Sequence, residues 1–249
     1  MSLIPILSPK KWKNRYSLLF DGVNECININ GVNTSLAATT VGTFSCWLNT
    51  SSLASTQVII GFGDTNANES IILFHNTTTL KTNVTKTGST SWSLQVTTNP
   101  LTINNWYHIA VVQDAVSPVI YVNGVVPAQT FPISTRKTEW FSVCLGLDNG
   151  RIGCDNSNNA GNASFVNGNL DEVAFFNTNL SATQILEIYN SGKPKNLLVH
   201  SAIANLVSYF RMGDGDTFGG TNWTLYDKKG TNNGTSIFME IGDLSMNVV

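Results

Sequence analysis

The chain has 249 residues, a formal net charge of −2 at pH 7 and only 12% charged residues, because Asn, Thr, Ser and Gly supply most of its polarity. A chain so poor in charge gives no electrostatic reason to expect a nucleic-acid partner. No stretch approaches the roughly 20 consecutive apolar residues of a membrane span, so we expect no membrane partner either.

The first 15 residues are typical of an arm that precedes the first strand. A short apolar run comes before the basic run KKWKNR, which ends at Arg15. A secretory signal has its basic and apolar residues in the opposite order, so we expect none. The basic run predicts a solvated arm, and Trp12 within it could dock onto a neighbouring subunit.

Short runs of β-branched and aromatic residues, separated by turn residues, follow along the chain. We expect strands at 16–20, 25–29, 43–49, 57–62, 70–75, 91–96, 106–113, 119–122, 142–147 and 170–176. Both faces of WYHIAVVQ at 106–113 are largely apolar, as in a strand covered on both sides. Asn123 and Gly124 lie between two apolar runs and predict a tight hairpin turn. Many strands without alternating helices indicate an antiparallel two-sheet sandwich.

Helix signals are few and lie late in the chain. Ser181 is a good N-cap for ATQILEIYN, and Gly192 would end that helix. Its predicted buried stripe consists of Ile185, Leu186 and Tyr189. A second short helix is expected at 201–206. Beyond it the chain is rich in loops and predicts an extension wrapped on the sandwich, because about 45 residues rarely sustain a core alone.

Four segments follow one another along the chain in an order that is typical of one superfamily: SLLFDGVNECININ, GTFSCWLNTS, NNWYHIAVVQDAVSPVIYVNGVV and VNGNLDEVAFFNTNLSATQILEIYNSG. Together they resemble the laminin-G-like branch of the concanavalin A-like lectin/glucanase superfamily, over about 16–192. The resemblance implies two curved antiparallel sheets, with the FDG strand beside the LDEV strand and a helical turn that closes the domain. We therefore expect an all-β jelly-roll sandwich with one or two short helices. Its predicted parts are an arm at 1–15, the jelly roll at 16–199 and an extension at 200–249.

Residues 209–243, YFRMGDGDTFGGTNWTLYDKKGTNNGTSIFMEIGD, resemble an ending found on laminin-G-like proteins of tailed bacteriophages. This resemblance implies a virion protein that is assembled in the host cytoplasm, either in the capsid decoration or in the tail or fibre. Its partners would be other virion proteins and further copies of itself. The expected absence of a secretory signal agrees with this interpretation.

The two adjacent acids Asp171 and Glu172 raise the question of catalysis. Retaining glycoside hydrolysis needs two carboxylates about 5–5.5 Å apart, and on a strand that requires acids at even spacing, on one face. The glucanase relatives carry a Glu-x-Asp-x-x-Glu pattern, whereas neighbouring acids on a regular strand face opposite ways. We therefore expect no enzyme and no catalytic residue. The expected role of Asp171 is structural, bonding backbone amides of an adjoining turn.

A calcium site is a second candidate. The laminin-G-like and pentraxin relatives bind calcium on loops at one edge of the sandwich, where carboxylate and amide oxygens gather. Beside the pentraxin pattern, the residues that fall near those loops are Asp64, Asn68, Glu69, Asp148 and Asn149. The alternative is that these residues form ordinary Asx turns. The loop Asp214-Gly215-Asp216 offers a similar choice between holding a cation and ending a strand.

Aromatic platforms are the usual way for such sandwiches to bind sugars. Trp92, Trp140 and Trp223 lie in polar, loop-like surroundings and are the candidate exposed stacking residues, with packing as the alternative. Trp47 and Trp106 lie in apolar strands and are expected in the core. The expected function is that of a non-enzymatic virion structural or adhesion protein that contacts host polysaccharide. The alternative is a calcium-dependent carbohydrate-binding lectin module.

Overall fold

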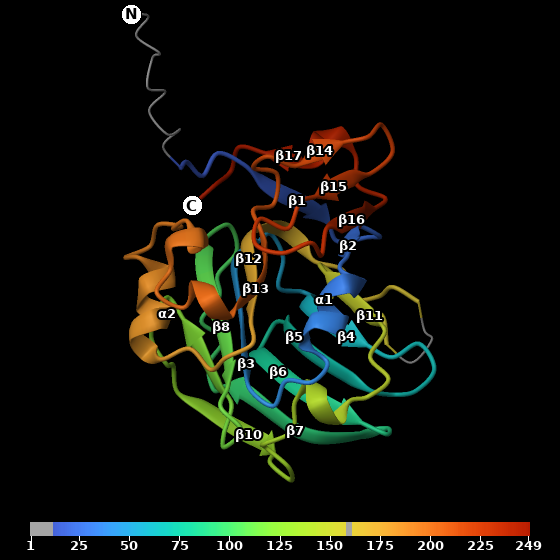
Figure 1. Cartoon of the computed structure of the whole chain (residues 1–249), viewed down its shortest axis with the longest axis vertical. Coiled ribbons are helices and arrows are strands. Elements are labelled where there is room, and N and C mark those ends of the chain that lie inside the picture. The colour runs from blue at the N-terminus through green and yellow to red at the C-terminus, as the bar shows by residue number, and fades with distance from the viewer. Residues whose placement is uncertain (1–11, 158–160) are drawn as a thin grey trace, which may run out of the picture.

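Three long strands, β3 (Gly42–Thr50), β8 (Trp106–Gln113) and β12 (Asn167–Phe176), lie side by side at the centre of one sheet, and almost every residue in them is buried. The computed structural model describes residues 12–157 and 161–249. It consists of two antiparallel sheets packed face to face, with few helical turns (Figure 1). The expected all-β sandwich is confirmed.

The first sheet has seven strands in the order β17-β1-β12-β3-β8-β9, and β13 also pairs with β12. The outer members are β1 (Ser17–Asp21), β9 (Val119–Val122), β13 (Leu206–Phe210) and β17 (Leu244–Ser245). β1 pairs with the first part of β12 and β13 with the second part. The implied neighbourhood of the FDG and LDEV strands is therefore confirmed.

The second sheet has ten strands in the order β10-β7-β6-β5-β4-β11-β2-β16-β15-β14. Their bounds are β2 (Cys26–Asn28), β4 (Gln57–Gly63), β5 (Ser70–His75), β6 (Leu80–Lys86), β7 (Ser89–Val96), β10 (Gln129–Ile133), β11 (Asn149–Ile152), β14 (Thr217–Phe218), β15 (Trp223–Leu225) and β16 (Gly234–Ile237). The extension thus supplies strands to both sheets.

The main core fills the space between the two sheets. At its centre Phe44 lies 4.9 Å from Trp140 and 5.5 Å from Phe62, measured between ring centroids. A second cluster covers the outer face of the seven-stranded sheet, where Ala174 and Phe176 of β12 meet helix α2 (Ala182–Tyr189). Both faces of β8 and β12 are consequently covered, as the apolar pattern of 106–113 predicts.

Helix α2 begins and ends largely as its sequence indicates. Ser181 accepts a hydrogen bond from the backbone N–H of Gln184, whose side chain returns the contact in a capping box. The helix ends where Asn190 adopts a left-handed φ of 47°, two residues before Gly192. Ser181 is therefore confirmed as the N-cap, and an asparagine takes the place of the expected glycine.

The buried stripe of α2 differs from the expected one. Ile185 and Ile188 are buried, whereas Leu186 is 49% exposed. The sheet contacts positions three apart on the helix, and Leu186 lies more than a quarter turn around the helix from both of them. Tyr189 is partly buried and stacks on Trp47 at 5.9 Å. The inclusion of Leu186 in the stripe was wrong.

Several expected elements change form. The strand predicted at 142–147 is absent: Phe141–Val143 forms a 3-10 turn, which buries Phe141 and Cys144 together in the core. The expected helix at 201–206 is a single 3-10 turn at Ile203–Asn205. A short helix α1 (Asn30–Leu36) and the strands β6 and β10 had no clear sequence signal.

The tight hairpin turn that Asn123 and Gly124 predict is present in the structure. Asn123 and Gly124 both have positive φ, 50° and 77°, as a tight turn of this kind requires.

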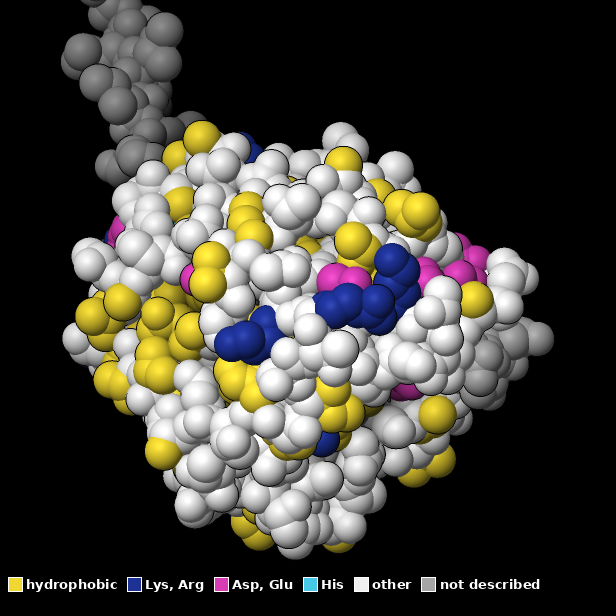
Figure 2. Space-filling view, turned by 90° about the horizontal axis from the view of Figure 1, so that it is seen from below, with side chains coloured by type: hydrophobic (Ala, Val, Ile, Leu, Met, Phe, Trp, Pro, Cys, Tyr) yellow, Lys and Arg dark blue, Asp and Glu magenta, His cyan; other side chains and the backbone are white. Residues whose placement is uncertain are grey.

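The face in Figure 2 is mostly uncharged, with a few Lys and Arg side chains near its centre and hydrophobic ones gathered mainly at one side. Within the described residues, no helix has both the length and the apolar character needed to cross a membrane.

Candidate functional site

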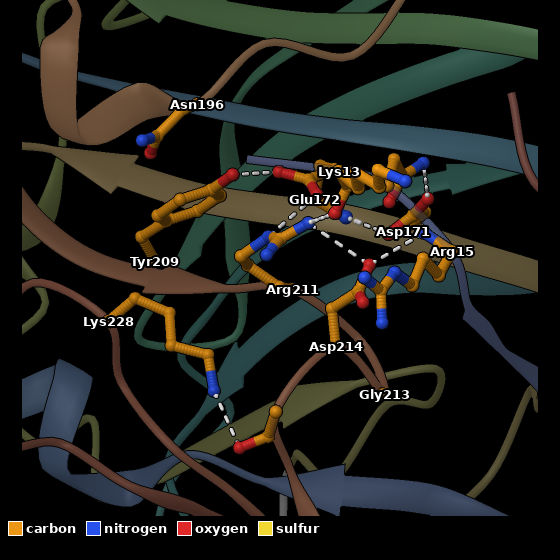
Figure 3. A network of polar contacts seen from close by, with 12 residues as sticks. Lys13, Arg15, Asp171, Glu172, Asn196, Tyr209, Arg211, Gly213, Asp214 and Lys228 are labelled. Atoms are coloured by element: carbon orange, nitrogen blue, oxygen red, sulfur yellow. Dashed lines mark hydrogen bonds and ion pairs between the residues drawn. The ribbon is translucent and has the colours of Figure 1, made fainter. Parts of the chain in front are cut away.

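Asp171 and Glu172 lie at a β-bulge in β12. The pairing with β3 shifts by one residue between Asp171, opposite Trp47, and Ala174, opposite Ser45. Glu172 takes up the extra residue with a left-handed φ of 49°. Both carboxylates consequently lie on the outer face of the sheet (Figure 3). The expectation that they face opposite ways was wrong, because it assumed an unbroken pleat.

Glu172 is held by two side chains of the extension. Its carboxylate accepts hydrogen bonds from the hydroxyl of Tyr209 and, at 3.1 Å, from Nε of Arg211. The same guanidinium donates through Nη2 to Asp214 at 3.0 Å, so one arginine bridges two carboxylates (Figure 3). These contacts fasten the extension to the outer face of the seven-stranded sheet.

The segment 12–15 covers this carboxylate network, which we define as Asp171, Glu172, Asp214 and Arg211. The covering hydrogen bonds run from Nδ2 of Asn14 to Asp171 (2.7 Å), from the backbone N–H of Arg15 to Asp214 (2.8 Å) and from Arg211 to the carbonyl oxygen of Lys13 (2.6 Å). The segment 12–15 and the extension therefore meet over β12.

Burial sets the protonation of the two adjacent acids. Asp171 is fully buried and Glu172 is 2% exposed. Burial raises the pKa of Asp171 well above its usual range, and the charge of Glu172 adds to this effect. Burial also raises the pKa of Glu172 to about 8, although Arg211 opposes the shift. Asp171 accepts the backbone N–H of Glu172 at 2.8 Å, so it bonds an amide as expected, but within the bulge and not in an adjoining turn.

A mixed-charge cavity of about 430 Å³ lies beside this network. The Arg211 guanidinium lies over the ring of Trp12, 4.8 Å from its centroid. Lys13, Arg15 and Asp214 also line the cavity. Trp12 thus packs against its own chain, and its predicted docking onto a neighbouring subunit stays a prediction.

The three candidate stacking tryptophans are not exposed. Trp92, Trp140 and Trp223 have exposed fractions of 0%, 1% and 4% and belong to the main core. The indole N–H groups of Trp92 and Trp223 donate to the carbonyl oxygens of Glu139 and Glu240. For Trp92 in β7 and Trp223 in β15, the polar neighbours in sequence occupy the opposite strand face, which explains the misleading pattern. The interpretation of these rings as exposed platforms was wrong.

The other two strand tryptophans differ from each other. Trp47 is 2% exposed and lies in the core, as expected. Trp106 is only partly buried, and its indole N–H donates to the side-chain oxygen of Asn247 at 3.2 Å. It is the first residue of β8, beyond the part of β8 that pairs with β9, and this position leaves it partly open to solvent. The expectation that Trp106 lies in the core was wrong.

The structure brings the two predicted calcium loops together. β11 pairs with β4, so Asp148 meets the loop after β4, and it accepts hydrogen bonds from the backbone N–H and the hydroxyl of Thr65. Asp64 accepts the backbone N–H groups of Asn66 and Ala67, at 2.6 and 3.2 Å. These are Asx-turn contacts, the alternative given above.

The remaining members of that set lie near Asp64 along the chain or across the sheet, but their side chains differ in exposure and partners. Asn68 is exposed, Glu69 is buried, and Asn149 accepts a hydrogen bond from Arg151 at 3.2 Å. Across residues 12–157 and 161–249, no group of three or more His, Cys, Asp or Glu side chains is arranged to hold a metal ion. The calcium site stays a prediction.

The acidic loop at 214–216 binds groups of its own chain. Besides its contacts in the carboxylate network, it places Asp216 2.7 Å from Nζ of Lys228 and 2.8 Å from the backbone N–H of Gly213. These bonds match the expected alternative, in which aspartates bond nearby amides at a strand end.

Phe238 is an exposed aromatic residue that the sequence analysis missed. It follows β16, is 66% exposed and has a positive φ of 61°. Two hollows of about 480 and 460 Å³ flank it, and both include Thr221. Asn, Thr and Ser side chains line much of the first hollow. Its exposure and its backbone angle are properties of the fold, so the sequence carries no signal that marks it.

Solved structures share this architecture at low identity. A protein from Bacteroides ovatus named for a proposed carbohydrate-binding role is 18% identical over 90% of this chain, with a TM-score of 0.59, and the alignment spans 58% of that protein. The CBM40 module of a Ruminococcus gnavus IT-sialidase, solved with α2,3-sialyllactose, is 14% identical over 70% of this chain and 97% of its own, with a TM-score of 0.58.

The heptameric SAP-like pentraxin of Limulus polyphemus is similar too, at 14% identity, 80% and 92% coverage and a TM-score of 0.54. Such identities show a shared fold and not a shared ligand. No curated protein matches the sequence. The family profile for concanavalin A-like lectin/glucanases matches residues 21–186, more than half of the chain. With its two-sheet fold, this match shows that the chain belongs to the laminin-G-type family of the concanavalin A-like lectin/glucanases superfamily.

Proposed function

We propose that the protein is a non-catalytic carbohydrate-binding module. The observation that carries the proposal is an exposed aromatic ring, Phe238, between hollows that offer hydroxyl and amide groups. Sugars present apolar C–H faces and many hydroxyls, so a ring with neighbouring polar groups suits them. The carbohydrate-binding names of the Bacteroides ovatus and Ruminococcus gnavus proteins support the same class of ligand.

The buried acids support the non-catalytic part of the proposal. A hydrolase needs two carboxylates that reach the glycosidic bond from opposite sides. Asp171 and Glu172 share one face, lie beneath residues 12–15 and are bonded to Asn14, Tyr209 and Arg211. A sugar could reach them only after residues 12–15, Tyr209 and Arg211 had moved away.

The test is a glycan array on the intact protein, run with and without EDTA, together with a reducing-sugar assay on bacterial polysaccharides. We expect binding to at least one glycan and no sugar release. Binding to no glycan would contradict the ligand class, and sugar release would contradict the non-catalytic role.

The measurement with EDTA distinguishes a calcium-dependent lectin from a module that binds sugar without calcium. That alternative draws on the contact between the loops of Asp64 and Asp148. If EDTA and Asp148→Ala both abolish glycan binding, the protein is a calcium-dependent lectin of this site. If binding is unchanged in both, those loops are structural turns.

We further propose that the module works in many copies on a virion, in the capsid decoration, tail or fibre. The resemblance of 209–243 to bacteriophage endings supports this context, and multiple copies would make even millimolar sugar contacts effective. Because Lys13, Asn14 and Arg15 bind the carboxylate network, the deletion that tests the arm should stop at residue 11. Normal incorporation of that deletion variant into particles would refute an assembly role for the arm.

A further inference from the structure

Phe238 adopts a backbone conformation that bulky residues rarely take. Its φ of 61° lies in the left-handed region, which costs a residue with a side chain on the order of 1–2 kcal/mol. Met212 also has a positive φ, of 44°, but it is completely buried, so packing offsets the cost. Phe238 is 66% exposed and gains little burial in return. A strained backbone conformation whose cost is not offset by burial of the side chain is typical of a functional site.

The chain on either side of Phe238 is fixed. Before it, Ile237 pairs with Cys26 of β2. After it, Met239 is 1% exposed, and the indole N–H of Trp223 donates to the carbonyl oxygen of Glu240 at 2.7 Å. Trp223 itself packs against Phe218, with ring centroids 5.5 Å apart. The fold therefore holds the Phe238 ring outward on a rigid support, which suits a stacking platform better than a mobile loop would.

Polar groups surround this ring. The hollow of about 480 Å³ is lined by Asn28, Thr221, Asn222, Thr235 and Ser236 beside Ile237 and Phe238. Thr221, at the tip of the β14–β15 hairpin, faces both hollows together with Phe238. A sugar ring stacked on Phe238 would thus find hydroxyl and amide partners within reach on one side.

The charge of the surroundings decides the class of sugar. No Asp, Glu, Lys or Arg lines the first hollow, and Glu240 is the one charged residue that lines the second. A sialic acid carboxylate would find no cation there and would be repelled by Glu240. An uncharged sugar carries no such penalty.

We infer that Phe238 is the stacking platform of a binding site for neutral sugars, formed by β16 and the β14–β15 hairpin. The inference rests on the proposed function and gives it a place and a ligand class. Apart from Asn28, the residues that line the site lie outside residues 21–186, which match the family. It also differs in its ligand from the CBM40 structure, which holds a sialylated sugar.

The key variant is Phe238→Gly, because glycine adopts this φ without strain. It should keep or raise the Tm and weaken binding about fivefold or more, since a lost stacking contact is worth about 1 kcal/mol or more. Leu145→Ala, which removes an 86% exposed side chain before β11, is the matched control and should bind as wild type. The probes are methyl glycosides of galactose, glucose and N-acetylglucosamine, with sialyllactose as the charged comparison, titrated by NMR.

The outcomes separate this inference from the proposed function. Neutral-sugar binding that is lost in Phe238→Gly and kept in Leu145→Ala supports both. Equal binding by wild type and Phe238→Gly, or a preference for sialyllactose, overturns the inference and leaves the carbohydrate-binding module intact. If no saccharide of the panel or the array binds wild type, both fail. Self-association that Phe238→Gly abolishes, without sugar binding, would instead assign the ring to a contact between copies.

Discussion

Glu172 carries a carboxylate that folding removes almost entirely from water while placing it beside one guanidinium. Removing a charge from water costs several kcal/mol, and a single ion pair offsets that cost only in part. Burial therefore raises the pKa of Glu172 to about 8 despite the contact with Arg211. The hydroxyl of Tyr209 completes the site. This carboxyl group is thus built into the fold and is closed to a substrate.

We predict that the stability of the protein falls as pH rises from about 5 to 8. The pKa of Glu172 moves from 4.5 in the unfolded chain to about 8 in the folded one. Across this window the folded state keeps a proton that the unfolded state has released. Rising pH therefore favours unfolding, by up to about 1.4 kcal/mol per pH unit for one such group. Urea unfolding at several pH values would measure the slope.

Two variants test which carboxyl groups cause this dependence of stability on pH. Glu172→Gln keeps an oxygen that can accept from Arg211 and Tyr209, but it cannot ionise, so its stability should depend less steeply on pH. Burial also raises the pKa of Glu25 to about 8, so Glu25→Gln should remove a separate share. A slope in Glu172→Gln equal to that of wild type would show that this carboxyl group does not hold its proton in the folded state.

At the level of elements, α2 shows how a helix closes one side of the sandwich. Its N-cap is readable from Ser181, but its orientation is fixed by the sheet beneath it. Ile185 and Ile188 pack on the outer face of β12, and Leu186 points along the surface.

We predict that Ile188→Ala destabilises the protein by about 2–5 kcal/mol, because it removes a buried side chain and leaves a cavity. Leu186→Ala should cost less than about 1 kcal/mol, because Leu186 is 49% exposed. The two changes delete side chains of equal size from neighbouring positions. Urea unfolding of both variants at one pH compares them directly. Equal losses of unfolding free energy would mean that Leu186 belongs to the buried face of the helix after all.

The sequence predicts elements best where a strand is apolar on both faces or bounded by turn residues. β5, β8 and β9 begin and end where their patterns do. β6, with the sequence LKTNVTK, lacks that signal, because polar residues outnumber its inward-facing apolar ones. α1 has no side-chain cap and few good helix formers.

The candidate site was harder to predict, for physical reasons. A strand pattern does not reveal which face turns inward, so the polar neighbours of Trp92 suggested exposure where there is none. A bulge adds one residue without any change in composition, so the shared face of Asp171 and Glu172 was invisible. Phe238 stands out only through its backbone angle and exposure, neither of which a sequence displays.

For the molecule as a whole, the two ends of the described chain meet on the seven-stranded sheet. β17 pairs with β1, and β13 occupies the edge of β12 that β1 leaves free. The hydroxyl of Ser17 donates to the carbonyl oxygen of Asn247 at 2.6 Å. The extension is hydrogen-bonded into both sheets, so it contributes to the stability of the sandwich as well as to its surface.

We predict that a chain ending at residue 205 does not form a stable monomer, whereas a chain starting at residue 12 keeps the wild-type Tm. Truncation after residue 205 removes β13 and leaves Glu172 without its contacts to Tyr209 and Arg211. Each buried polar group left without its hydrogen-bond partner costs about 1–3 kcal/mol, and the pairing of β13 with β12 is lost as well, against the 5–15 kcal/mol that stabilises a typical domain. Thermal melts and size-exclusion chromatography would compare the two. A cooperative melt of the chain ending at residue 205, near the wild-type Tm, would mean that the jelly roll is complete before the extension begins.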